Sequence, residues 1–96
     1  MDNNVKNLLD ELNFEDYGYP YTDIGYVMFL KELHIELEVY GGEGENYGKW
    51  YYYIADNRSS MVGIDDYSDD EYDTFEDAFN DGLIKCLKYA IEEPEY

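Results

Sequence analysis

The chain has 96 residues, of which 24 are Asp or Glu and 6 are Lys or Arg, so its formal net charge is 6 − 24 = −18. This charge argues against direct binding to nucleic acid or to an anionic membrane, since both need clustered basic residues. Disordered chains are also highly charged but poor in aromatic residues, whereas 19% of this chain is aromatic. We therefore expect one folded acidic domain over residues 1–96.

The first 21 residues are predicted to form a helix followed by a tyrosine-rich linker. Apolar side chains recur at helical spacing over residues 4–12, which indicates a short amphipathic helix. Gly18, Pro20 and alternating tyrosines then favour an extended linker over residues 13–21. The remaining core is expected to span residues 22–92.

This core is predicted to begin with a helix over residues 23–33, because Thr22 can cap it. Its buried face is expected to include Ile24, Val27, Met28 and residues 30–33.

A half-buried strand is predicted over residues 34–40, where polarity alternates strictly. Ile35, Leu37 and Val39 would point inward, and Glu36 and Glu38 outward. The aromatic run at residues 49–55 predicts a second strand, paired antiparallel with the first across a glycine-rich loop.

A shorter third strand is possible at residues 60–64, followed by an acidic loop over residues 65–73. Thr74 and Asp77 then resemble a capping box, which predicts a closing helix with a wide apolar face. Gly82 lies within that face, where it would allow close approach to the sheet. The predicted fold class is α+β: two N-terminal helices, a small antiparallel sheet of two or three strands, and a C-terminal helix packed on the sheet.

Several of these segments resemble a group of small uncharacterised proteins of bacteriophages and prophages of gut bacteria. The likeness covers residues 22–92. It lies in Leu30-Lys31-Glu32 before a strand, the run Trp50–Ile54, the acidic loop, and Tyr72–Phe79 with Gly82-Leu83 and Cys86-Leu87-Lys88. The resemblance implies an α+β fold and a phage setting, with anti-defence inhibitors of the anti-CRISPR type as one possibility. It implies no activity.

The densest negative charge predicts a binding surface for a basic protein. Six acids of the predicted loop are its candidate residues: Asp65, Asp66, Asp69, Asp70, Glu71 and Asp73. Glu36 and Glu38 join them from a strand face, where they would lie about 6.6 Å apart. Carboxylates so placed can imitate a phosphate backbone, and we expect the surplus acids to gather on one side of the molecule. The partner would be a nucleic-acid-binding host defence protein, such as a CRISPR effector or a restriction enzyme. The alternative is a solvated charge run that serves only solubility.

The tyrosines allow a second interpretation, an interaction module or homodimer. Tyr40 could form an aromatic patch with Tyr51 and Tyr53, or with Trp50 and Tyr52 in the other register. Such a surface would bind a partner without using the charge. The alternative is that these rings belong to the core.

Metal, cofactor and catalytic roles are not expected. An EF-hand loop starting at Asp69 would place Thr74 at position 6 and Asn80 at position 12, where Gly and Glu are needed. His34 and Cys86 are predicted to face different sides, so they would form no nucleophile pair. A single cysteine and the absence of a recognisable signal peptide or apolar span favour a cytoplasmic protein.

Overall fold

The computed structural model describes residues 3–56, 64–68 and 70–92. Its elements in chain order are α1 (Asn3–Glu11), α2 (Phe14–Tyr17), α3 (Asp23–Glu32), β1 (Ile35–Gly41), the 3-10 turn η1 (Gly44–Asn46), β2 (Trp50–Asp56), β3 (Ile64–Tyr67) and α4 (Phe75–Glu92). The predicted α+β class is confirmed, because the helices combine with a three-stranded antiparallel sheet and α4 packs on that sheet.

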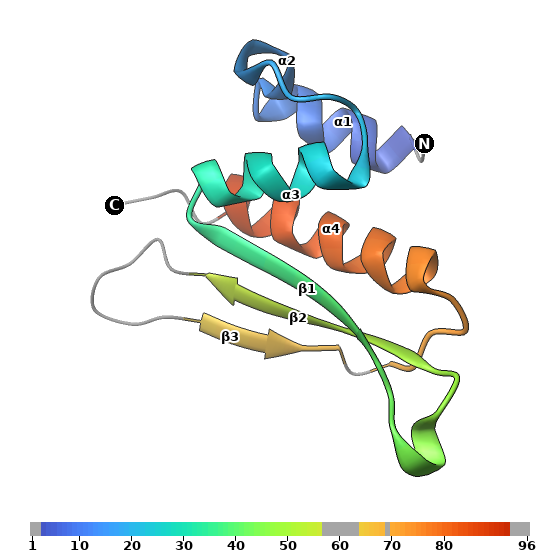
Figure 1. Cartoon of the computed structure of the whole chain (residues 1–96). Coiled ribbons are helices and arrows are strands. Elements are labelled where there is room, and N and C mark those ends of the chain that lie inside the picture. Colours follow the sequence, from blue (N-terminus) through green and yellow to red (C-terminus); the bar gives the residue numbers. More distant parts are fainter. Residues whose placement is uncertain (1–2, 57–63, 69, 93–96) are drawn as a thin grey trace.

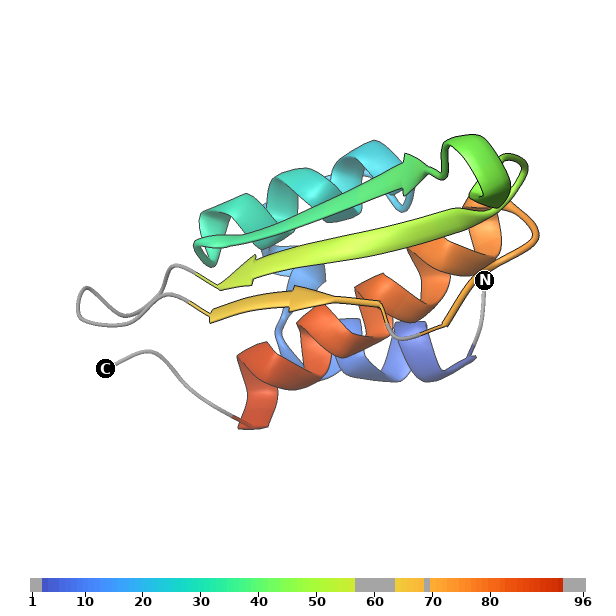
Figure 2. The same cartoon turned by 90° about the horizontal axis from the view of Figure 1, so that it is seen from below.

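The elements form layers on one side of the sheet (Figure 1). β2 lies between β1 and β3 and is antiparallel to both. α3 and α4 cover one face of the sheet, and α1 and α2 lie beyond them (Figure 1). Figure 2 shows the sheet from below, where none of the described helices lies in front of the strands. The sheet therefore has an inner face that α3 and α4 cover and an outer face that no described helix covers.

The inner face carries the predicted core. Ile35 and Leu37 of β1 are buried, as the alternation predicts, and Tyr52 and Ile54 of β2 lie opposite Val39 and Leu37 in the same register. Gly82 of α4 makes the close approach expected of it. A Cβ atom at this position would lie 2.7 Å from Cδ1 of Leu37 and 3.1 Å from Cγ of Tyr52.

Both predicted N-caps are confirmed. The backbone N–H of Gly25 donates to Oγ1 of Thr22 over 3.2 Å, and that of Asp77 donates to Oγ1 of Thr74 over 3.1 Å. Each hydroxyl satisfies a donor that the first turn of a helix leaves without an intrahelical partner.

The linker predicted over residues 13–21 is wrong in part, because it contains the short helix α2. Phe14 begins this helix and is 1% exposed, so the segment contributes to the core. Asn13 and Gly18 flank it in left-handed conformations, with φ of 58° and 80°. These two residues turn the chain sharply on either side of one helical turn.

The buried face predicted for α3 is also wrong in part. Leu30 is buried as expected, but Ile24 is 73% and Met28 47% exposed, and the helix buries Tyr26 and Phe29 instead. Apolar residues occur all round α3, so its sequence marks no single face. The packing of Phe14 and α4 against α3 decides which side chains are buried.

The third strand extends further along the chain than predicted. β3 spans Ile64–Tyr67, whereas the prediction was residues 60–64, of which 60–63 lie outside the described residues. Asp65 and Asp66 are therefore strand residues and not part of an acidic loop, which corrects that assignment. The first strand begins at Ile35, because His34 adopts a left-handed φ of 62° between α3 and β1.

Candidate binding surface on the outer sheet face

The outer sheet face combines tyrosines with carboxylates. In the strand register Glu38 lies opposite Tyr53, which lies opposite Tyr67, and the next row pairs Tyr40 with Tyr51. Residues opposite each other in antiparallel strands share a face. We define the outer sheet face by its described side chains: Glu36, Glu38, Tyr40, Tyr51, Tyr53, Ala55 and Tyr67.

The tyrosine rings form two cross-strand pairs. Tyr40 and Tyr51 are stacked, with centroids 5.5 Å apart and ring planes at 22°, and Tyr53 lies 4.7 Å from Tyr67 at 41°. Tyr67 is 60% and Tyr40 42% exposed. The register with Tyr51 and Tyr53 is thus the one adopted, and Tyr52 belongs to the core. These rings offer a broad aromatic surface with polar edges.

Glu36 and Glu38 occupy alternate positions of β1, and both side chains are exposed. Glu71 adds a third carboxylate at the edge of this surface, because its Oε1 accepts a hydrogen bond from the Tyr51 hydroxyl over 3.3 Å. Burial and the nearby Glu71 raise the pKa of the Tyr51 hydroxyl, so that this hydroxyl keeps its proton. No described position of the outer sheet face is Lys or Arg.

Asp66 does not belong to this surface. It lies opposite Ile54 in the register, and its carboxylate contacts α4 on the inner side. Its Oδ2 lies 2.7 Å from Nζ of Lys85 and accepts a hydrogen bond of 2.7 Å from the Tyr89 hydroxyl. These contacts attach β3 to α4. We therefore assign Asp66 a structural role in place of the predicted binding role.

This attachment makes a testable prediction for acid stability. The hydrogen bond from Lys85 lowers the pKa of Asp66 below its ordinary value of 3.8. A carboxyl whose pKa is lowered by folding stabilises the protein above its unfolded pKa, and the stabilisation is lost as the pH falls through the folded value. At pH 7, Asp66→Asn should lower the free energy of unfolding by about 1 to 3 kcal/mol. Urea denaturation at pH 7 and in acid measures this loss, which should shrink in acid.

Asp73→Asn is the matched control, because it removes the same charge from a pair that lies in solvent. Asp73 accepts from Nζ of Lys49 over 2.6 Å, but its side chain is 82% exposed. Because solvent screens this pair, the loss of stability should be clearly smaller than that caused by Asp66→Asn. Equal losses for the two variants would contradict the structural role of Asp66.

The remaining acids of the predicted loop are separated by the fold. Asp69 lies outside the described residues, and the side chain of Asp65, opposite Ala55 in the register, is not described. Asp70 and Glu71 are exposed. After β3 the segment stays beside β2, where Trp50 and Tyr72 exchange backbone hydrogen bonds of 2.8 and 3.0 Å and the Ser68 N–H donates to the Tyr52 carbonyl over 2.9 Å. Only Glu71 is shown in contact with a residue of the outer sheet face.

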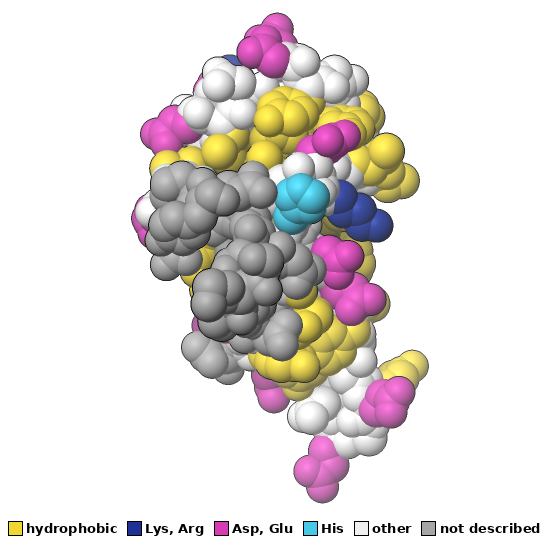
Figure 3. All heavy atoms as spheres, turned by 90° about the vertical axis from the view of Figure 1, so that its left-hand side faces the viewer, with side chains coloured by type: hydrophobic (Ala, Val, Ile, Leu, Met, Phe, Trp, Pro, Cys, Tyr) yellow, Lys and Arg dark blue, Asp and Glu magenta, His cyan; other side chains and the backbone are white. Residues whose placement is uncertain are grey.

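The expectation that the surplus acids gather on one side is wrong. Exposed acids occur on all four helices and on β1 as Asp10, Glu11, Glu15, Asp16, Asp23, Glu32, Glu36, Glu38, Glu76, Asp77, Asp81 and Glu92. Figure 3 shows acidic side chains scattered over one side of the molecule, with hydrophobic side chains between them. The negative charge therefore surrounds the protein, and charge alone does not select a binding face.

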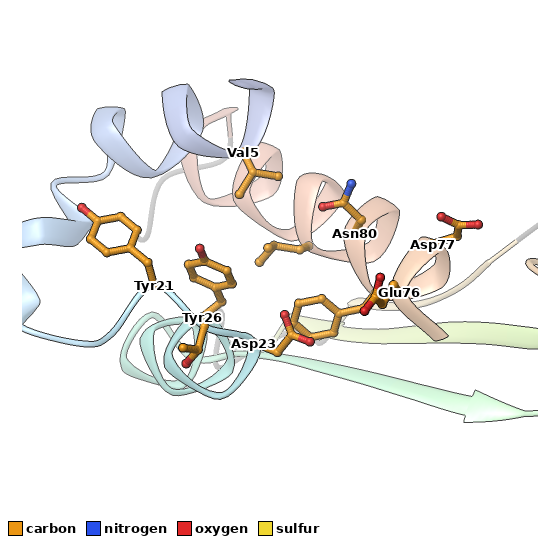
Figure 4. Close-up of a pocket in the computed structure, with 10 residues that line it drawn as sticks. Val5, Tyr21, Asp23, Tyr26, Glu76, Asp77 and Asn80 are labelled. Carbon is orange, nitrogen blue, oxygen red and sulfur yellow. The ribbon is translucent and has the colours of Figure 1, made fainter. Parts of the chain in front are cut away.

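A groove of about 380 Å³ lies between α1, the start of α3 and the start of α4 (Figure 4). Tyr21 and Tyr26 line it together with three acids, Asp23, Glu76 and Asp77. These acids lie in the first turns of α3 and α4, where carboxylates stabilise the positive end of a helix dipole. Their position is therefore explained by helix stability.

The structure brings together no nucleophile pair from His34 and Cys86. Cys86 is fully buried in α4, whereas His34 is exposed in the turn before β1. Among the described residues, no group of His, Cys, Asp and Glu has the arrangement of a metal site. Within the same part of the chain, no helix is both long enough and apolar enough to cross a bilayer.

The fold and the outer sheet face thus define a small α+β protein with one sheet face free of described helices. No protein-family model matches the chain, and no match was found among curated proteins or solved structures. The resemblance to phage proteins therefore stays a prediction.

Sequence reasoning missed Tyr67 as a member of the outer sheet face. Its strand contains two consecutive acids, Asp65 and Asp66, which hide the alternation that marks β1. It also missed the contact of Glu71 with Tyr51, because these residues are 20 positions apart in the sequence. Alternating polarity in a sequence indicates which side chains of one strand share a sheet face, but not which residues of other segments lie beside them.

Proposed function

We propose that this chain is a non-enzymatic binding protein that competes with nucleic acid for the cationic surface of a host protein. A CRISPR effector, a restriction enzyme or another defence nuclease would be such a partner. The outer sheet face carries this proposal, because it presents carboxylates, has no described basic residue and is free of described helices. A net charge of −18 spread over the molecule would speed the encounter with a basic partner.

The spacing of the glutamates supports phosphate mimicry. Glu36 and Glu38 are two positions apart along β1, which corresponds to about 6.6 Å in an extended strand. Two successive phosphate steps of a nucleic-acid strand advance about 6.8 Å along the duplex axis. A row of basic side chains that binds phosphates could thus meet both carboxylates.

The proposal predicts a loss of binding that depends on position and not only on charge. The chain would be immobilised and exposed to bacterial lysate at low salt. The captured proteins should bind nucleic acid and should be released by added duplex DNA or by high salt. The double variant Glu36→Gln/Glu38→Gln should capture at least about tenfold less of them, since a pair of close charges across an interface is worth more than about 1.4 kcal/mol.

The matched control is Glu11→Gln/Glu15→Gln, which removes the same charge from α1 and α2 on the far side of the molecule. It should retain most of the capture. Equal loss in the two variants, or captured proteins that duplex DNA does not release, would refute competition through the outer sheet face.

A homodimer through the same face is the second candidate, and the exposed Tyr40 and Tyr67 favour it. In such a dimer the glutamates of two copies would share one interface and repel each other. Salt would weaken this repulsion, so dimerisation should strengthen with salt, whereas binding to a basic partner should weaken. Sedimentation equilibrium at low and high salt separates the two candidates.

A further inference from the structure

The outer sheet face places carboxylates and aromatic rings side by side. In one cross-strand row Glu38 is followed by Tyr53 and then by Tyr67. In the next row Tyr40 and Tyr51 are stacked, and Glu71 accepts the hydrogen bond from Tyr51. Glu38 on this face and Glu71 at its edge thus each lie beside a tyrosine.

This pairing suits a guanidinium group better than an ammonium group. A guanidinium is planar and weakly hydrated, so it can stack on a ring while its N–H edge donates to a carboxylate. An ammonium is a strongly hydrated point charge that gains less from a ring. On this face the carboxylate and the ring that a guanidinium would contact lie on neighbouring strands, which are about 4.8 Å apart.

The rows repeat with the period of an extended peptide. Each cross-strand row of the outer sheet face contains one outward residue of β1 and the β2 residue opposite it. The β1 members of successive rows are Glu36, Glu38 and Tyr40, which are two residues apart. Alternate side chains of an extended peptide recur at the same interval of about 6.6 Å. Arginines at every second position of such a peptide would therefore meet successive rows.

A groove of about 230 Å³ extends this surface over the edge of β1 toward α3. Val27 and Leu37 supply apolar walls, and Glu36, Glu38 and Tyr53 also line the groove. The aliphatic stem of an arginine could lie along such walls while its head remains at a carboxylate. Lys31 is the one basic residue among the described residues that line the groove.

We propose that the outer sheet face recognises an extended segment with arginines at alternate positions, and that it prefers arginine to lysine. This inference rests on the proposed function and names the part of the basic partner that the face contacts. Charge complementarity selects this occupant. A second copy of the chain would bring like charges together, and a nucleic acid would bring phosphates to glutamates.

Two labelled peptides of equal length and charge test the preference, one alternating Arg with Ser and the other Lys with Ser. Fluorescence anisotropy at low salt should show about tenfold tighter binding of the arginine peptide, as expected if a few guanidinium groups each stack on a ring. Tyr53→Leu/Tyr67→Leu keeps apolar side chains but removes both rings, and it should reduce the preference to about twofold or less with little change for the lysine peptide.

Tyr47→Leu is the control, because Tyr47 is 86% exposed and belongs to the loop that connects β1 to β2, outside the outer sheet face. It should leave the preference unchanged. The inference would be overturned by equal affinity for the two peptides, by no binding of either, or by a Tyr47→Leu variant that loses the preference as much as the double variant does.

If the two affinities are equal but duplex DNA still releases the captured proteins, the arginine preference is wrong and the proposed competition with nucleic acid stands. An arginine preference without release by DNA would overturn only the proposed competition with nucleic acid.

Discussion

Replacing Phe14 with alanine should lower the free energy of unfolding by about 3 to 5 kcal/mol, the usual cost of removing a fully buried aromatic ring. Phe14 is 1% exposed. Its ring meets Phe29 edge-on at 4.9 Å and lies 5.0 Å from Tyr21 and 5.5 Å from Tyr26. Such a loss is a large part of the roughly 5 to 15 kcal/mol that stabilises an ordinary domain. Urea denaturation followed by circular dichroism measures it.

Tyr47→Ala provides the comparison, since it removes an aromatic side chain that is 86% exposed. Its effect should remain within about 0.5 kcal/mol. If Phe14→Ala were no more destabilising than this control, α2 would not contribute to the core, and the packing of α2 against α3 described above would be wrong.

Replacing Gly25 with alanine should also destabilise the protein, although alanine favours helices by about 1 kcal/mol over glycine. Gly25 lies in the first turn of α3, where the chain from Pro20 folds back against it. A Cβ atom there would overlap the carbonyl oxygen of Pro20 and lie 2.9 Å from its carbonyl carbon. The clash is with backbone, so Pro20 and the cap at Thr22 would have to move. We expect a net loss of about 1 to 3 kcal/mol.

Ile24→Ala is the matched control one residue earlier in the same helical turn. Ile24 is 73% exposed, so this change should alter stability by less than about 0.5 kcal/mol. Thermal unfolding of the two variants under one set of conditions gives the comparison. A Gly25→Ala variant as stable as the wild type would show that the contact with Pro20 relaxes at little cost.

The elements with a clear period could be predicted from the sequence. β1 alternates, α4 has an apolar face that begins after Thr74, and the hairpin with β2 follows from two strand patterns around a glycine-rich loop. In each case local preference and burial agree. The fold class followed from these elements.

The parts that could not be predicted depend on contacts between distant segments. α2 is a single turn of four residues, too short for a helical period to appear. α3 is apolar on several sides, so only its packing determines that Phe29 is buried and Ile24 is not. The inward position of Asp66 depends on Lys85 and Tyr89, which lie about three and four helical turns after the start of α4.

The candidate surface was predictable to the same extent. Glu36 and Glu38 follow from the alternation of β1. The strand pattern of β2 left two registers open, and the structure decides for Tyr51 and Tyr53. The separation of Asp66 and Asp73 into ion pairs with Lys85 and Lys49 does not follow from the sequence, because a run of acids in a sequence shows neither direction nor partners.

Among the described strands, the order β1-β2-β3 leaves one side of β1 without a paired strand, and this has a consequence for handling the protein. An unpaired strand can add strands of other copies and grow into aggregates unless its side chains prevent it. Glu36 and Glu38 would set like charges against one another in such a stack. The Glu36→Gln/Glu38→Gln variant would therefore lose solubility along with affinity, and it should be kept dilute and checked for fibrils before its binding is measured.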